Sequence, residues 1–390
     1  MPYWLTAMSS VSAAAARLFQ DAANALETSR TSIRAGIAVT GLGSELGEQA
    51  VADACTAAVS KGYDIVYLGL ESVPGAANVR CEDENACRDE MEKLLQSGRC
   101  DAAVTMHHLF PIGTATVGRV TTPARGKDVF IATTTGTPSS DRVEGLVLGA
   151  LYGIIAAKSC GVDSPTVGIL NIYGAHRAES ALRKLRSNGF PVEFAESARP
   201  EGGAIMRGND VLLGTADVIV SDPLTGNVLM KMLSAFNSGG DRECVGYGYG
   251  PGIGADAKHP ILIISRASDT PVILNAIRYA ADVSIGGISG ITSELLAQAD
   301  RCGLSGVIES PDGTATGKEP SAAPPKREPV TESISGIEIE DIDHATRFLW
   351  GNGIYAESGM GCTGPVVLVN ESNIARSVEL LIEAGMIGVK

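Results

Sequence analysis

The sequence is poor in several features that mark whole classes of protein. Aromatic residues make up only 5% of the 390 residues, and only five histidines are present. The 31 lysines and arginines are outnumbered by 45 acidic residues, so the formal net charge is −14. Nucleic acids and anionic membrane surfaces repel a chain this acidic. We therefore expect small molecules or other proteins as partners, and neither nucleic acid nor membrane.

Long apolar runs and paired cysteines are also scarce. The most apolar run, 145–157, is too short to cross a bilayer and is interpreted as a buried helix. The eight cysteines show no Cys-x-x-Cys spacing and no secretory leader is recognisable, which predicts reduced thiols and a cytoplasmic protein. Cys81 and Cys87 flank an acidic stretch that lacks zinc-site spacing, so we expect a solvated loop there. We expect no metal and no organic cofactor.

Short apolar runs separated by helical patterns fill the middle of the chain. They are typical of strands that are buried on both faces of a parallel sheet, and they predict an α/β fold. The expected strands are 35–39, 64–69, 101–106, 129–133, 166–172 and 218–220. The glycines of 41–47 do not have the spacing of a dinucleotide fingerprint, so no nicotinamide site is expected.

The loops that follow three of these strands are the first candidate binding sites. Ligands of open α/β sheets bind beyond the carboxyl ends of the strands, which directs attention to 107–108, 134–136 and 173–176. His108, and His107 beside it, are candidates only because of this position, since a lone histidine is more often structural.

The polar segment 221–227 is a candidate anion site. It precedes a helix that we expect from Val228, and a helix N-terminus offers free backbone N–H groups and a favourable dipole. Lys231, one turn into that helix, would add positive charge. A satisfied helix cap with a lysine in solvent is the alternative interpretation. The candidate residues are Asp222, Thr225, Gly226, Asn227 and Lys231.

A second glycine-rich segment, 246–254, leads through an apolar strand to the loop 266–268. Glycine at every second position allows a backbone to lie against a ligand, and a flexible surface loop is the alternative. The candidates for binding substrate or phosphate here are Gly248, Gly250, Arg266 and Ser268.

The C-terminal part of the chain carries a cysteine between glycines. Cys362 stands in the sequence 357–365 (ESGMGCTGP), ahead of an apolar run, where a thiolate would be accessible on a tight loop. An ordinary small core residue is the alternative. The expected segments of the chain are a helical segment 1–34, an α/β domain 35–308, a flexible linker 309–333 and a cysteine-bearing module 334–390.

Three segments resemble the phosphate acyltransferases of phospholipid synthesis, which exchange an acyl thioester for an acyl phosphate. The segment 217–231 is similar to their D-G-F-x-G-N-V-x-L-K motif, 166–172 to their V-G-L-L-N-I strand, and 259–281 to their closing segment. The resemblance implies a three-layer α/β/α fold with a long, mostly parallel mixed sheet, as in isocitrate and isopropylmalate dehydrogenases. Pro223 and Leu224 replace the Gly-Phe of the motif and Arg266 replaces a histidine, so the acyl-chain pocket of that family is not assumed.

This core, followed by a linker and ESGMGCTGP, resembles the alpha subunits of component C in glycine, sarcosine and betaine reductase complexes. The resemblance implies an acyltransferase that converts an enzyme-bound acetyl thioester and inorganic phosphate, its co-substrate, to acetyl phosphate. Cys362 would carry the acyl group, Asn227 and Lys231 would bind phosphate or stabilise the tetrahedral state, and Asp222 would orient Lys231 or its loop. The implied partners are a ketoacyl synthase-like beta subunit and selenoprotein A of the complex, in an oligomer.

Two other functions stay open at this point. A free-standing phosphate acyltransferase that uses acyl carrier protein thioesters would not need Cys362. A non-catalytic partner or scaffold subunit would use the cysteine module for docking, and the departures at Pro223 and Leu224 keep this alternative open.

Overall fold

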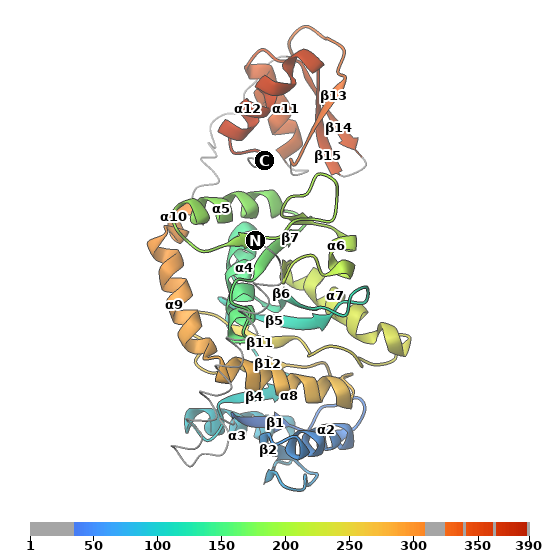
Figure 1. Cartoon of the computed structure of the whole chain (residues 1–390), viewed down its shortest axis with the longest axis vertical. Helices are drawn as coiled ribbons and strands as arrows, with labels where there is room; N and C mark the ends of the chain where they lie inside the picture. The colour runs from blue at the N-terminus through green and yellow to red at the C-terminus, as the bar shows by residue number, and fades with distance from the viewer. Residues whose placement is uncertain (1–34, 309–323, 338–340, 362–363, 388–390) are drawn as a thin grey trace, which may run out of the picture.

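The computed structural model describes residues 35–308, 324–337, 341–361 and 364–387 (Figure 1). The helical segment expected at 1–34, most of the expected linker and Cys362 lie outside the described residues. Among the described residues, no helix is both long enough and apolar enough to cross a bilayer.

A 12-stranded mixed sheet organises residues 35–308. Along the sheet the order is β3-β2-β1-β4-β12-β11-β5-β6-β10-β7-β8, with β9 also paired to β7. The strands are β1 (Gly36–Thr40), β2 (Asp64–Gly69), β3 (Ala77–Arg80), β4 (Ala102–Thr105), β5 (Thr114–Thr121), β6 (Asp128–Thr137), β7 (Thr166–Leu170), β8 (Glu193–Phe194), β9 (Ile205–Met206), β10 (Val218–Val220), β11 (Gly250–Ile253) and β12 (Ile261–Ile263).

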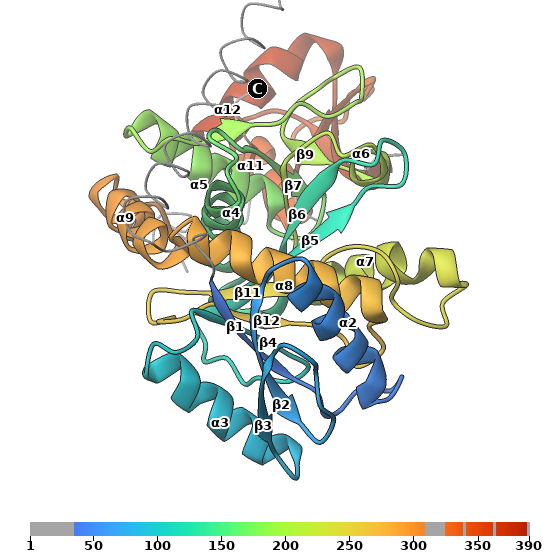
Figure 2. The same ribbon diagram turned by 60° about the horizontal axis from the view of Figure 1, so that its bottom comes forward.

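Helices cover both faces of this sheet, which gives the expected three-layer α/β/α architecture (Figures 1 and 2). Alternate residues of each strand enter different cores: Ile65 and Tyr67 of β2 pack on one face, and Val66 on the other. The first face carries α2 (Glu48–Ser60), α4 (Arg142–Ser159), α5 (Ala175–Ser187), α8 (Thr270–Ile285), α9 (Ile288–Arg301) and α10 (Leu304–Ile308). The second face carries α3 (Glu84–Gln96), α6 (Gly208–Leu213) and α7 (Pro223–Ala235).

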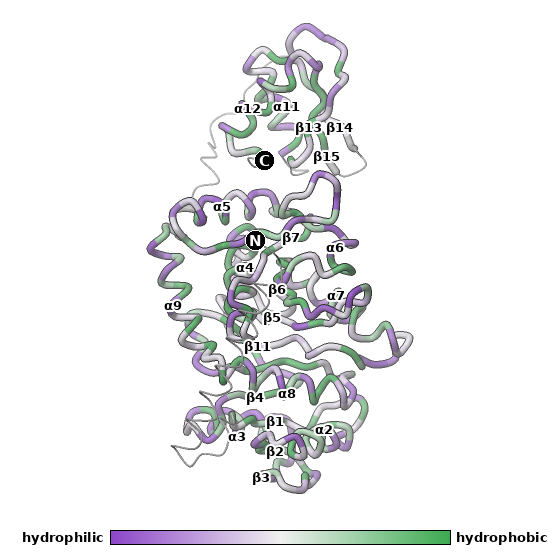
Figure 3. The backbone as a smooth tube through the Cα atoms, in the orientation of Figure 1, coloured by the Kyte–Doolittle hydropathy of each residue, from purple (hydrophilic) through white to green (hydrophobic). Residues whose placement is uncertain are grey.

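The apolar run 145–157 lies within α4, which is buried along most of its length, as expected. Figure 3 shows where α4 lies in the backbone coloured by hydropathy.

The direction of the strands decides which of the candidate loops share an edge of the sheet. β12 runs parallel to β4, whereas β11 is antiparallel to β12, β5 to β11, and β6 to β5. β10 and β7 follow the direction of β6. The carboxyl ends of β4 and β7 therefore lie at opposite edges, so the loops 107–108 and 173–176 do not form one site. Residues 134–136, expected as a loop, lie inside β6.

The C-terminal residues form a second, smaller unit with its own apolar core. Its antiparallel sheet has the order β13 (Glu332–Ser335), β15 (Gly364–Val369), β14 (Ala356–Gly361), and it packs with α11 (Ile342–Gly351) and α12 (Ile374–Glu383). β13 begins inside the segment that was expected to be a linker. Arg177 of α5 forms an ion pair with Asp341 at the start of α11, which joins this unit to the larger one.

Candidate functional site

Helix α7 begins five residues earlier than the sequence suggested, and this changes the chemistry of its N-terminus. The helix starts at Pro223, with Asp222 as its N-cap. One oxygen of Asp222 accepts hydrogen bonds from the backbone N–H groups of Leu224 (3.1 Å) and Thr225 (3.0 Å), and the other from the Thr225 hydroxyl (2.6 Å). The N–H of Gly226 donates to the Asp222 carbonyl (2.9 Å). The expectation of free backbone donors at 225–226 is therefore wrong, because the cap already uses them.

The same hydrogen bonds make the Asp222 cap sensitive to acid. Burial opposes ionisation of this carboxyl, but the bonds from Thr225 and Leu224 outweigh it and hold its pKa below the ordinary value of 3.8. Because the folded-state pKa is depressed, the stabilisation is present above pH 3.8 and is lost as the pH falls through the lower folded-state pKa.

Replacement of Asp222 by alanine is expected to lower the unfolding free energy at pH 7 by about 0.5–2 kcal/mol, the usual loss for an N-cap. The deficit relative to the parent should shrink below pH 4, as the parent carboxyl becomes protonated. Urea unfolding from pH 7 to pH 3 measures this. Asp300→Ala, at an exposed position of α9, serves as a control that should show neither effect. A deficit that is independent of pH would contradict the assignment of the cap.

Lys231 lies on α7 where the helix passes the carboxyl end of β12. Its ammonium donates to Glu243 Oε1 (2.8 Å) and to the hydroxyl of Ser265 (2.8 Å), the second residue after the end of this strand. Half of the Lys231 side chain is exposed, whereas the side chain of Glu243 is 1% exposed. Tyr249 donates its hydroxyl to the same Glu243 oxygen (2.9 Å). The structure therefore brings Lys231 into a polar cluster with three residues that the sequence did not suggest.

Asn227 lies one turn before Lys231 on α7, and its amide nitrogen donates to the carbonyl of Thr134 in β6 (3.3 Å). Gly226 beside it is a packing residue: a Cβ added there would lie 1.8 Å from the carbonyl oxygen of Thr133. The glycine thus allows α7 to approach the backbone of β6 closely.

The glycines of the segment 246–254 serve packing and turn geometry. Gly248 and Gly250 have φ angles of +76° and +84°, which favour glycine. A Cβ on Gly250 would meet the Val117 carbonyl oxygen at 1.7 Å, and one on Gly248 would meet Ile264 at 2.9 Å. Tyr247 and Tyr249 are buried between these glycines. The segment therefore consists of the buried strand β11 and the buried residues that precede it. It is neither a flexible surface loop nor a backbone surface open to a ligand.

Arg266 and Ser268 follow Ser265 but point to different partners. Arg266 forms an ion pair with Glu84 (2.7 Å) and donates to the carbonyl of Gly43 (2.9 Å), so it joins the loop after β1 to the loop after β12. The buried Ser268 accepts a hydrogen bond from the Ser265 N–H (3.1 Å) and supports that turn.

His108 lies at the same edge of the sheet as Ser265, because β4 and β12 are parallel neighbours. Its ring packs edge-on against Phe110, with centroids 4.8 Å apart, and its buried Nδ1 has no hydrogen-bond partner among the described residues. Burial lowers the pKa of this imidazole below 6.5, so the neutral form predominates at pH 7. A neutral imidazole adds no positive charge for a phosphate ligand.

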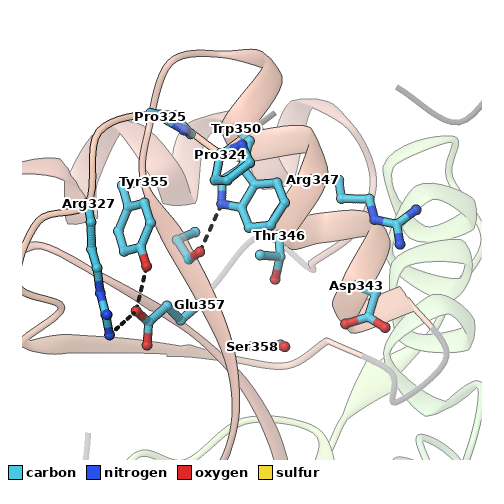
Figure 4. A pocket seen from close by; sticks show the side chains of 11 residues that line it. Pro324, Pro325, Arg327, Asp343, Thr346, Arg347, Trp350, Tyr355, Glu357 and Ser358 are labelled. Atoms are coloured by element: carbon cyan, nitrogen blue, oxygen red, sulfur yellow. Dashed lines mark hydrogen bonds and ion pairs between the residues drawn. The ribbon is translucent and has the colours of Figure 1, made fainter. Parts of the chain in front are cut away.

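Cys362 lies outside the described residues, between the paired Gly361 and Gly364. The strand β14 that leads to it borders a cavity of about 580 Å³ in the small unit (Figure 4). Trp350 donates its indole N–H to the Ala356 carbonyl there (2.8 Å), and Glu357 accepts from the Tyr355 hydroxyl (2.6 Å). The cavity is lined by Pro324, Pro325, Arg327, Asp343, Thr346, Arg347, Trp350, Tyr355, Ala356, Glu357 and Ser358.

Some signals in the sequence could have indicated the missed residues. Ser265 is the last residue of the predicted apolar strand 261–265, and ligand-binding side chains of α/β proteins gather at this end of a strand. Glu243 stands just before the glycine-rich segment and gives no signal by itself, because its partner Lys231 is twelve residues away across a turn.

Comparison with known proteins identifies relatives over most of the chain. A family model described as "Fatty acid synthesis protein" matches residues 35–368. The glycine/sarcosine/betaine reductase complex component C subunit alpha of Peptoclostridium acidaminophilum is 46% identical over 384 residues, 97% of this chain and 100% of the relative. The phosphate acyltransferase of Thermotoga neapolitana is 32% identical over 154 residues, 36% of this chain and 46% of the relative. A branched-chain phosphotransacylase from Enterococcus faecalis, 17% identical, superposes with a TM-score of 0.47 and covers 64% of this chain and 99% of its own.

Proposed function

Since the chain belongs to the fatty acid synthesis protein family and matches a component C subunit alpha over nearly its whole length, we propose that it is the acyltransferase subunit of an amino-acid reductase complex. Its role would be to convert an acetyl thioester on Cys362 and inorganic phosphate to acetyl phosphate. The observation that carries the proposal is the donor pair formed by Lys231 and Ser265 at the carboxyl end of β12.

This pair has the donors that a phosphate oxyanion needs. Two of the three N–H bonds of the Lys231 ammonium are engaged, which leaves one for a ligand on its exposed side. The Ser265 hydroxyl accepts from Lys231 and from the Ala267 N–H (3.2 Å), and no described residue accepts its proton. Both groups would therefore donate to the phosphate or to the oxyanion of the tetrahedral intermediate.

The proposed reaction exchanges one bond at the acetyl carbon for another. An oxygen of monohydrogen phosphate attacks the thioester carbonyl, and the carbon–sulfur bond to Cys362 breaks with its electron pair on sulfur. The proton of the phosphate ends on the sulfur, so the products are acetyl phosphate and the free thiol. No redox partner is needed for this step.

The proposed partners are a ketoacyl synthase-like beta subunit and the selenoprotein of the same complex, in the cytoplasm. The name of the P. acidaminophilum relative places that protein in a complex. Helix α7 supports a subunit role here, because its residues Leu224, Val228 and Met232 and the next residue at the same spacing, Phe236 just after the helix, form an apolar row with exposures of 74, 50, 63 and 77%.

Arsenolysis of acetyl phosphate tests the proposed reaction with this chain alone. Reverse transfer from acetyl phosphate would load the thiol, and arsenate in place of phosphate would release an acetyl arsenate that hydrolyses. The expected result is loss of acetyl phosphate that depends on both protein and arsenate. Without such loss, and without exchange of labelled phosphate into acetyl phosphate, the proposal would fail.

A phosphate acyltransferase that uses acyl carrier protein thioesters is the second candidate, favoured by the partial matches to phosphate acyltransferases. Formation of long-chain acyl phosphate from an acyl carrier protein thioester, unchanged by loss of Cys362, would select it.

A further inference from the structure

Glu243 supplies the carboxylate of the Lys231 cluster, its side chain is 1% exposed, and only one of its oxygens is hydrogen-bonded to described residues. Oε1 accepts from the Lys231 ammonium (2.8 Å) and the Tyr249 hydroxyl (2.9 Å). Oε2 is buried and has no hydrogen-bond partner among the described residues. Burial of a carboxylate oxygen without a hydrogen-bond partner costs desolvation free energy, and an apolar residue of similar size often stabilises a fold equally well.

The backbone of Glu243 is tied to the turn that carries Ser265. The Glu243 N–H donates to the Ala267 carbonyl (2.9 Å), and its carbonyl accepts from the Asp269 N–H (2.8 Å). Its side chain reaches Lys231 on α7 and Tyr249 just ahead of β11. Glu243 therefore fixes the position of three chain segments relative to one another at the point where the two donors meet.

A lysine side chain has four rotatable bonds, and an exposed ammonium would sample many positions. The contact with Glu243 holds Lys231 against Ser265, so that its remaining N–H has a defined direction. We propose that Glu243 is a positioning residue that aims the Lys231 ammonium at a phosphate oxyanion shared with Ser265. This inference deepens the proposed function and rests on it for the identity of the ligand.

Isothermal titration with inorganic phosphate tests the positioning role without any turnover. Glu243→Gln keeps the size and an acceptor for Tyr249 but removes the charge that holds Lys231. We expect phosphate to bind this variant about tenfold to a hundredfold more weakly, which corresponds to the loss of one charge-assisted hydrogen bond. Glu179→Gln, which removes the partner of Arg183 on α5, is the matched control and should bind as the parent does.

A double-mutant cycle with Lys231→Met separates positioning from general stability. If Glu243 acts through Lys231, adding Glu243→Gln to Lys231→Met should weaken phosphate binding no further. Additive losses, unchanged binding, or tighter binding by Glu243→Gln would each overturn the proposal. If Glu243→Gln does not fold, Glu243→Asp replaces it, because it keeps the charge and shortens the reach. Parent-like binding by Glu243→Asp would then overturn the proposal.

The outcomes of arsenolysis and titration are distinguishable. Phosphate binding that depends on Glu243 in a protein without arsenolysis would refute the proposed reaction and leave the positioning role intact. Parent-like rates and KM for arsenate in Glu243→Gln would leave the reaction intact and refute positioning.

Discussion

Replacement of Cys362 by alanine is expected to abolish the arsenolysis of acetyl phosphate. Without a sulfur at this position no acetyl thioester forms, and arsenate has no acyl-enzyme to attack. The expected residual rate is that of the solution without protein. Labelled acetyl phosphate should leave no acetyl group on the variant, which mass spectrometry of the intact chain would show.

Four of the described thiols make poor substitutes for Cys362. Burial raises the pKa of Cys55, Cys87 and Cys160 to about 12 and that of Cys100 to about 11, which keeps these thiols protonated at neutral pH. Cys302→Ala, at the end of α9, is the matched control and should react at the parent rate. Parent-like arsenolysis in Cys362→Ala would eliminate Cys362 as the acyl carrier.

Replacement of Gly226 by alanine is expected to destabilise the fold strongly. In an ordinary helix interior this change is stabilising, by roughly 1 kcal/mol. Here the new Cβ would lie 1.8 Å from the carbonyl oxygen of Thr133, a backbone atom that no side-chain rotation can move away. To remove this clash, α7 would have to move away from β6. Overpacking of this kind lowers the unfolding free energy by about 1–3 kcal/mol or more.

Gly290 offers a matched control on α9. A Cβ added there would meet no atom within 4 Å, so Gly290→Ala should be neutral or slightly stabilising. The urea midpoints of both variants and the parent provide the comparison. Equal stability of Gly226→Ala and the parent would mean that α7 does not pack this closely against β6.

The layered architecture could be predicted from the sequence because most of the buried strands are short apolar runs. β1, β2, β4, β6, β7 and β10 all fall on predicted apolar runs. β5 was harder to predict, since its sequence mixes threonine with glycine and one of its partners lies in β11, more than a hundred residues later. The reversals of direction at β11, β5 and β6 separate the loops after β4 and β7.

The candidate site was only partly predictable, for reasons that individual residues show. Asp222 followed by Pro223 is the signature of an N-cap and first helical position, but the glycine and asparagine at 226–227 suggested a turn instead. Gly226 is needed because α7 packs closely against β6, a strand that is remote in sequence. The position of this glycine in the sequence therefore does not indicate where the helix begins. Ser265 and Glu243 meet Lys231 only after folding.

The position of β11 and β12 has a consequence for synthesis of the chain on the ribosome. These two strands occupy the middle of the sheet, between β4 and β5, yet they come from residues 250–263. Until they emerge, β4 and β5 present unpaired edges, and such edges recruit other strands. The first 249 residues therefore form two incomplete half-sheets, and we expect nascent chains stopped before β11 to bind chaperones or aggregate rather than fold.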